Sequence, residues 1–284
     1  MSKRILAGLV CLAFWALTGS ALSQEQQQKP QAPPPAAPQA EKAPAPAPAP
    51  DPLQIAQKMC DFLKSQQQFT YKAEVAVDEV YYGSKKIQYE TGLEFFVKRP
   101  DQLRVNAVGD RVDKQFYIDG KTITLYDKDH NVYGTLEVPP DLESALEKAH
   151  KEFGFRVSLS DLASPDLWEL MEKHIKHSLY VGKSRIRGVL CHHLSFDGEN
   201  VQFQQWIDAG EQPLLRKIVI TYKKLPDSPQ WTAYISDWNF SPQLNANLFA
   251  FTPPPGAEKI KFVPVAPSQA PKPEPGMKKE GGKS

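Results

Sequence analysis

Residues 87–104, IQYETGLEFFVKRPDQLR, decide the fold. Successive side chains of a β-strand point to opposite faces, so a repeat of two predicts a strand with one apolar face. One phase of this stretch is mainly apolar, and Phe96 alone interrupts the mainly polar phase. Pro100 cannot donate to a sheet and ends the strand. The apolar phase comprises Ile87, Tyr89, Thr91, Leu93, Phe95 and Val97.

The length of this strand and the residue at its end favour a curved sheet around a cavity. Strands usually have about five or six residues, and one of about eleven favours a wide, curved sheet. Arg99 continues the apolar phase, where a cation is tolerated only at a cavity rim or beside a partner. The pattern indicates a protein that holds a lipid or another apolar ligand. An ordinary surface ion pair is the alternative role for Arg99.

Alternating runs and helical stripes continue through residues 53–263. Helical spacing is expected at 53–63, where Asp51 and Pro52 suit the cap and the first turn, at 141–153 before Gly154, and from Ser164 onward. Short turns between the strand-like runs make neighbours antiparallel. We expect a mainly β (α+β) domain, a strongly curved antiparallel half-barrel of about eleven strands, with an N-terminal helix and inserted helices covering the concave face. An immunoglobulin-like sandwich is the alternative, but its strands are usually shorter.

Several short motifs in this domain carry a family resemblance. One set resembles the LolA/LolB lipoprotein carriers, and a second set is similar to a predicted periplasmic family of unknown function with the same fold (domain of unknown function family 2092). The first set comprises 97–100 (VKRP) with Leu103, 117–121 (YIDGK) with Leu125 and Tyr126, and 249–256 (FAFTPPPG). The second set comprises 191–194 (CHHL), 206–208 (WID), 213–217 (PLLRK) and 236–239 (SDWN). In the carriers, the arginine that matches Arg99 is implicated in holding a helical lid over the cavity.

A filled core and a ligand cavity are both compatible with the inward aromatic residues. Composition alone favours a filled core, whereas the carrier resemblance favours a cavity. We expect an exported, non-enzymatic binding protein that holds a lipid, a lipoprotein acyl chain or another apolar ligand by burial alone. The alternative is an envelope sensor or scaffold that binds a protein segment with the same face. The residues expected to bind the ligand are Tyr89, Leu93, Phe95, Val97, Arg99, Leu103, Leu146, Phe153, Trp168 and Met171.

The two ends of the chain differ from the domain in composition. Lys3 and Arg4 precede an apolar run and small residues, which predicts a secretory signal at 1–23 and a periplasmic location; an uncleaved anchor is the alternative. Residues 24–52, rich in Pro, Ala and Gln, and 264–284, rich in Pro and Lys, lack a periodic apolar pattern. We expect both to be disordered tethers or docking segments for a partner. No later apolar run is long enough to span a membrane.

The polar residues indicate neither catalysis nor a metal, cofactor or nucleic-acid site. His174 and His177 lie three positions apart, and Cys191 shares a strand face with His193, but no spacing matches a closed zinc ligand set. No nucleophile elbow, phosphate-binding glycine loop or zinc-protease motif occurs. A net charge of +1 does not favour capture of an acidic polymer. Cys60 and Cys191, which lie outside the predicted signal, are expected either to pair or to be buried as small apolar residues.

Overall fold

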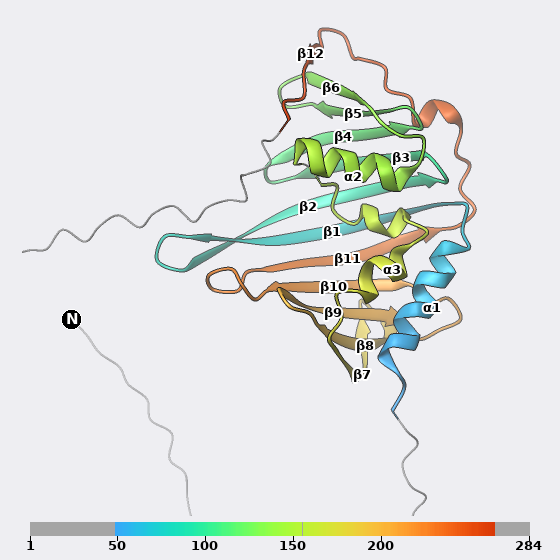
Figure 1. The fold of residues 1–284 in the computed structure, drawn as a ribbon, viewed down its shortest axis with the longest axis vertical. Helices are drawn as coiled ribbons and strands as arrows, with labels where there is room; N and C mark the ends of the chain where they lie inside the picture. The colour runs from blue at the N-terminus through green and yellow to red at the C-terminus, as the bar shows by residue number, and fades with distance from the viewer. Residues whose placement is uncertain (1–48, 155, 265–284) are drawn as a thin grey trace, which may run out of the picture. The chain divides into compact units, whose positions relative to one another are not determined.

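The computed structural model of the chain describes residues 49–154 and 156–264. Its strands form one sheet in the order β12-β6-β5-β4-β3-β2-β1-β11-β10-β9-β8-β7 (Figure 1). All neighbours pair antiparallel except β12, which pairs in parallel with β6. The strands are β1 (Gln68–Tyr81), β2 (Lys85–Lys98), β3 (Gln102–Gly109), β4 (Val112–Asp119), β5 (Thr122–Asp127), β6 (Val132–Glu137), β7 (His177–Ile186), β8 (Val189–Asp197), β9 (Val201–Asp208), β10 (Leu215–Tyr222), β11 (Gln230–Asn239) and β12 (Glu258–Ile260). The predicted fold class, a curved antiparallel sheet with few helices, is confirmed.

The stretch that decides the fold forms β2, which pairs with β1 along its whole length, from Gln68 opposite Lys98 to Tyr81 opposite Lys85. The apolar phase of β2 is buried only in the second half of the strand, which neighbouring strands and helices cover. Beyond Val77, β11 no longer pairs with β1. The β1–β2 hairpin projects there beyond the other strands (Figure 1), and Ile87 is therefore exposed.

The helices begin and end largely where their cap residues predict. In α1 (Pro52–Lys64) the Asp51 side chain accepts from the Leu53 amide, and in α2 (Leu142–Phe153) Asp141 accepts from the Ser144 amide. Gly154 ends α2 with a φ of 71°, a left-handed conformation that glycine adopts without strain.

The helix expected from Ser164 onward is wrong in its extent. The structure has a 3₁₀ turn, η1 (Ser160–Ala163), followed by α3 (Leu167–Glu172), and Ser164 between them is extended. A residue before proline disfavours the helical conformation, and Pro165 therefore separates the two pieces.

The helices cover the concave face of the sheet. α1 contacts α3 and strands β7, β8 and β9, and α3 contacts η1. In Figure 1, α2 lies in front of β3 and β4, and its buried residues Leu142, Ala145 and Ala149 join the same hydrophobic core. This arrangement follows the prediction that inserted helices cover the concave face.

The segment after β11 covers part of the opposite, convex face. Phe251 packs against three tyrosines of β4, β5 and β6, with ring centroids 5.3 Å from Tyr117, 5.5 Å from Tyr126 and 5.1 Å from Tyr133. The Arg104 guanidinium lies over Tyr117 at 4.9 Å and over Phe96 at 5.9 Å. The aromatic residue that interrupts the polar phase of β2 is thus placed in a covered part of the convex face.

The two cysteines of the domain do not pair. Cys60 and Cys191 are both free and buried. Cys60 belongs to the core on the concave face, whereas Cys191 packs with Trp206 and Val219 in a separate cluster on the convex face. Burial raises the pKa of the Cys60 thiol to about 12 and that of Cys191 to about 11, so both remain protonated at neutral pH. Of the two alternatives, buried small apolar residues are the correct one.

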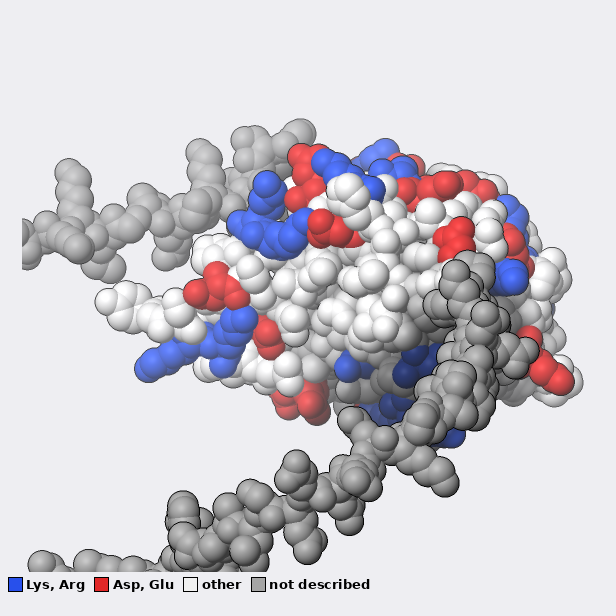
Figure 2. Space-filling model, turned by 90° about the horizontal axis from the view of Figure 1, so that it is seen from below, with Lys and Arg blue, Asp and Glu red and all other residues white. Residues whose placement is uncertain are grey.

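The predictions for the ends of the chain are a signal at 1–23 and disordered arms at 24–52 and 264–284, and residues 1–48 and 265–284 of these lie outside the described residues. At the described end of the first arm the boundary is wrong, because Asp51 caps α1 and Pro52 is its first residue. Within the described ranges, no helix has the length and apolar character needed to cross a membrane. On the face seen in Figure 2, basic and acidic side chains are interspersed around uncharged surface, with no large field of one sign.

Candidate functional site

An aromatic stack fills one end of the concave face. It consists of Phe69, Tyr71, Phe95, Trp238 and Phe240, and Tyr71 lies at its centre. The Tyr71 ring stacks on Phe95 at 4.3 Å and on Trp238 at 4.7 Å. The Tyr71 hydroxyl donates to the Leu159 carbonyl at 2.9 Å, and burial raises the pKa of this hydroxyl well above its ordinary value. The contacts between these rings fill this part of the concave face with side chains of the protein.

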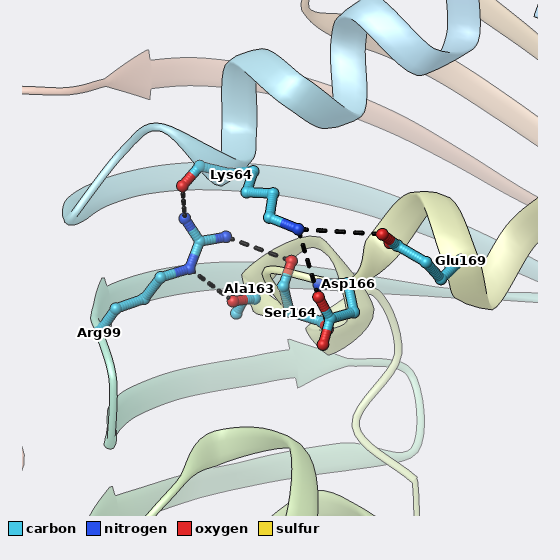
Figure 3. A network of polar contacts seen from close by, with 6 residues as sticks. All are labelled: Lys64, Arg99, Ala163, Ser164, Asp166 and Glu169. Carbon is cyan, nitrogen blue, oxygen red and sulfur yellow. Dashed lines mark hydrogen bonds and ion pairs between the residues drawn. The ribbon is translucent and has the colours of Figure 1, made fainter.

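Arg99 holds the covering elements beside the stack (Figure 3). Its Nη1 donates to the carbonyls of Leu63 at 2.6 Å and Gln66 at 2.5 Å, at and just after the C-terminal end of α1. Its Nε donates to the Ala163 carbonyl at 2.9 Å and its Nη2 to the Ser164 carbonyl at 3.3 Å, at the end of η1. The last carbonyls of a helix lack partners within the helix, and a cation is favoured there. One side chain directly after β2 therefore holds α1 and η1 together.

The alternative role of Arg99 as a surface ion pair is not what the structure shows. Among the described residues, no carboxylate forms an ion pair with Arg99; the neighbouring ion pairs belong to Lys64, which contacts Asp166 at 3.4 Å and Glu169 at 3.9 Å (Figure 3). These three side chains are about half exposed. Arg99 is the stronger tie because it makes charge-assisted hydrogen bonds to partly buried carbonyls.

At the other end of the concave face the helices and the sheet border an open cavity of about 720 Å³. Its floor comes from β9, β10 and β11, and its other walls come from α1, α2, η1 and α3. Several floor residues are only partly buried although they are apolar and face inward, so the helices do not fill this space. The apolar lining includes Met59, Leu146, Met171, Val201, Phe203, Leu215, Ile218, Ile220 and Trp231.

The rim of the cavity carries charges of both signs. Glu143 and Glu147 of α2 lie beside Lys151 and Arg156, and all four are exposed. Partial desolvation by its neighbours and the nearby carboxylates of Asp166 and Asp141 raise the pKa of Glu143. An apolar interior with a charged rim can bury a hydrocarbon group while a polar group of the ligand stays in water.

Only some of the residues expected to bind a ligand line this cavity. Leu146 and Met171 do, and Arg99 hydrogen-bonds to Ser164, which lines it too. The other seven lie elsewhere, and packing of the concave face accounts for five of them. Leu93, Phe95, Val97 and Leu103 are in the packed core, and Trp168 is half-buried against it. Phe153 packs on Phe262 at 5.6 Å, and Tyr89 lies on the projecting hairpin under the Arg111 guanidinium at 3.4 Å.

The sequence reasoning missed most of the cavity floor. Val201 and Phe203 on β9, Ile218 and Ile220 on β10, and Trp231 on β11 lie on inward phases of predicted strands. Their alternation was readable, but it does not tell which inward residues a helix will cover. A second missed signal is Gln205, a polar residue on the otherwise apolar inward phase of β9.

The family motif residues on β8, β9 and β10 support the convex face instead. His193 stacks on Trp206 at 4.1 Å, and the Lys217 ammonium lies 4.7 Å from the Trp206 ring. Arg216 pairs with Asp208 at 2.9 Å. In the described part of the chain, no group of three or more histidine, cysteine, aspartate and glutamate residues is placed to hold a metal ion.

Solved structures with a similar arrangement include an uncharacterized conserved protein from Thermus thermophilus, with 9% identity, a TM-score of 0.42, and coverage of 73% of this chain and 97% of that chain. LprF from Mycobacterium bovis is 15% identical, with a TM-score of 0.40 over 74% of this chain and 99% of that chain. A LolA superfamily protein from Nitrosomonas europaea is 11% identical, with a TM-score of 0.34 over 72% of this chain and 99% of that chain.

A comparison with curated proteins found no match. Residues 53–263 match the family described as "Predicted periplasmic protein (DUF2092)", the family that the sequence motifs indicated, and its description agrees with the expected location. The match covers most of the chain, and the protein belongs to this family of predicted periplasmic proteins.

Proposed function

We propose that the domain is a periplasmic binding protein that holds a lipid, an acyl chain or another apolar ligand in the cavity between α2, α3 and strands β9, β10 and β11. Binding consists of burial, with no covalent step. Each Å² of apolar surface removed from water contributes roughly 25 cal/mol, so a long acyl chain gains several kcal/mol before the cost of ordering it.

One observation carries this proposal: inward apolar residues of the sheet face a space that the helices leave open. Ile218, Ile220 and Trp231 are only partly buried and stand opposite Leu146 and Met171 across the cavity. The volume of about 720 Å³ falls within the roughly 300–1,000 Å³ that is usual for small-molecule sites.

The test is displacement of an environment-sensitive apolar dye by octadecanoic acid, with one variant inside the cavity and one outside. Leu146→Glu places a carboxylate on the cavity wall and should weaken dye binding about fivefold or more, because a lost apolar contact and a desolvated charge add up. Leu179→Glu is the matched control, since Leu179 lies on the edge strand β7 with 61% of its surface exposed. Equal affinities in the two variants would contradict the proposal.

Native mass spectrometry of the protein isolated from its own envelope fraction identifies the class of occupant. A retained lipid supports a carrier or lipid-binding protein. A retained peptide would replace this proposal with the sensor or scaffold that binds a protein segment. We further infer that residues 1–23 are a cleaved signal and that the Pro-rich arms tether the domain, so the mature chain should begin at or near Gln24.

A further inference from the structure

One polar side chain lies in the apolar floor of the cavity. Gln205 is on β9, where its register neighbours are Leu194 on β8 and Ile218 on β10. Phe203 and Ile207 precede and follow it on the same face of the strand. Its side chain lines the cavity, yet the residue is only 3% exposed. An amide is therefore held away from bulk water among hydrocarbon groups.

The hydrogen-bonding capacity of this amide is largely unused. Its Nε2 contacts the Met171 sulfur at 3.4 Å, and a thioether is a weak acceptor. Its Oε1 has no hydrogen-bond partner among the described residues. Most buried polar side-chain atoms have a partner, and one without a partner destabilises the folded state.

The missing partner can be characterised whichever way the amide is turned. With Oε1 toward the cavity, the partner must donate a hydrogen bond. If oxygen and nitrogen exchange places, the partner must accept one. A hydroxyl group both donates and accepts, and it satisfies the amide in either orientation.

We propose that the ligand is a lipid whose apolar part bears a hydroxyl group, and that this hydroxyl hydrogen-bonds to Gln205. This inference rests on the proposed function, since it concerns the occupant of the same cavity. An unsubstituted hydrocarbon chain that entered from the charged rim would place methylene groups against the amide and leave it without a partner. Gln205 therefore selects hydroxylated chains over plain ones.

The test compares octadecanoic acid with monohydroxy derivatives whose hydroxyl lies near the carboxylate, in mid-chain or near the terminal methyl. Affinities follow from the fluorescence of Trp231, which lines the cavity. The full chain should bind at least one hydroxylated acid roughly two- to tenfold more tightly than octadecanoic acid, the range that a net hydrogen bond confers. Gln205→Leu should bind octadecanoic acid at least as well as the wild type and lose the preference.

The adjacent residue provides a matched control. Gln204 points to the opposite face, where its Oε1 lies 2.8 Å from His193 Nε2, so Gln204→Leu should keep the preference. Gln205→Met keeps an unbranched side chain of similar length, and it repeats the test if leucine disturbs folding.

Three outcomes overturn the inference. The first is that the wild type shows no preference for hydroxylated acids over octadecanoic acid. The second is that Gln205→Leu and Gln205→Met keep the full preference. In both cases, binding of octadecanoic acid leaves the proposed function intact. The third is failure to bind any of these acids, which contradicts the proposed function as well.

Discussion

The two ends of the concave face are built from the same kind of residue but reach opposite results. At one end, Tyr71 and Phe95 stack face to face, and Arg99 hydrogen-bonds to the ends of α1 and η1 beside them. At the other end, Ile218 and Ile220 on equivalent inward phases face a cavity of about 720 Å³. Inward apolar residues alone therefore do not define a binding site. The proposed site lies where the covering helices leave part of the sheet open.

The two ends therefore differ in what they contribute to the protein. The aromatic stack, where rings fill the space and carbonyls have a charged donor, stabilises the sheet and fixes α1. The cavity keeps apolar surface accessible at a cost in stability, as binding sites do. The connection between them is short, because Ser164 accepts a hydrogen bond from Arg99 and also lines the cavity.

The largest expected effect is on stability, at the filled end. Phe95→Ala should lower the free energy of unfolding by about 3–5 kcal/mol, since it opens a void in a fully packed stack. Ile220→Ala at the cavity floor should cost only about 1 kcal/mol, because that side chain is partly exposed and borders an existing space. Urea unfolding of the two variants measures both values. Equal losses would mean that the two ends do not differ in packing.

The next effect concerns the tie between the ends. Arg99→Leu removes the hydrogen-bond donors that α1 and η1 share. The equilibrium between the covered and the open cavity should therefore shift by roughly 1.5–3 kcal/mol, or about 10- to 150-fold. Binding of an apolar dye should change by at least several-fold while the thermal transition stays cooperative. Lys98→Leu on the convex face is the control. Small and equal effects from both substitutions would show that Arg99 does not control the cover.

The smallest effect is expected at the exposed ion pairs of Lys64. Lys64→Met removes the contacts to Asp166 and Glu169 and should lower the free energy of unfolding by less than about 1 kcal/mol, because water screens exposed charges. Thermal unfolding at low and high salt measures this contribution, which should shrink as salt rises. A loss as large as that from Arg99→Leu in the same assay would show that these exposed ion pairs hold α1 as firmly as the carbonyl hydrogen bonds of Arg99 do.

The fold could be predicted because its signals are local. The alternation in 87–97 gives β2 and its inward face, and Asp51, Asp141 and Gly154 mark helix ends by their own hydrogen bonds and conformation. Arg99 could be placed because a cation that ends an apolar phase requires acceptors nearby.

The cavity could not be predicted with the same precision because it depends on contacts between distant segments. Phe95 and Ile218 carry the same inward signal, yet a ring from β1 covers the first, whereas α2 and α3 leave the second open. Phe96 is a similar case, since it lies under Arg104, whose guanidinium also donates to the Leu248 carbonyl in the segment after β11. Gln205 was visible as a polar residue on an apolar phase, but its missing partner is a property of the folded cavity.

The contrast between the ends is tested most directly by fluorine NMR of the chain labelled with 5-fluorotryptophan, during titration with octadecanoic acid. Trp231 lies on the cavity wall, Trp238 in the aromatic stack, and Trp206 on the convex face, and Trp→Phe substitutions assign their resonances. We expect the ligand to shift the Trp231 resonance and to leave those of Trp238 and Trp206 in place. A shift at Trp238 equal to or larger than that at Trp231 would show that the ligand enters the aromatic stack, and it would contradict the assignment of the binding site.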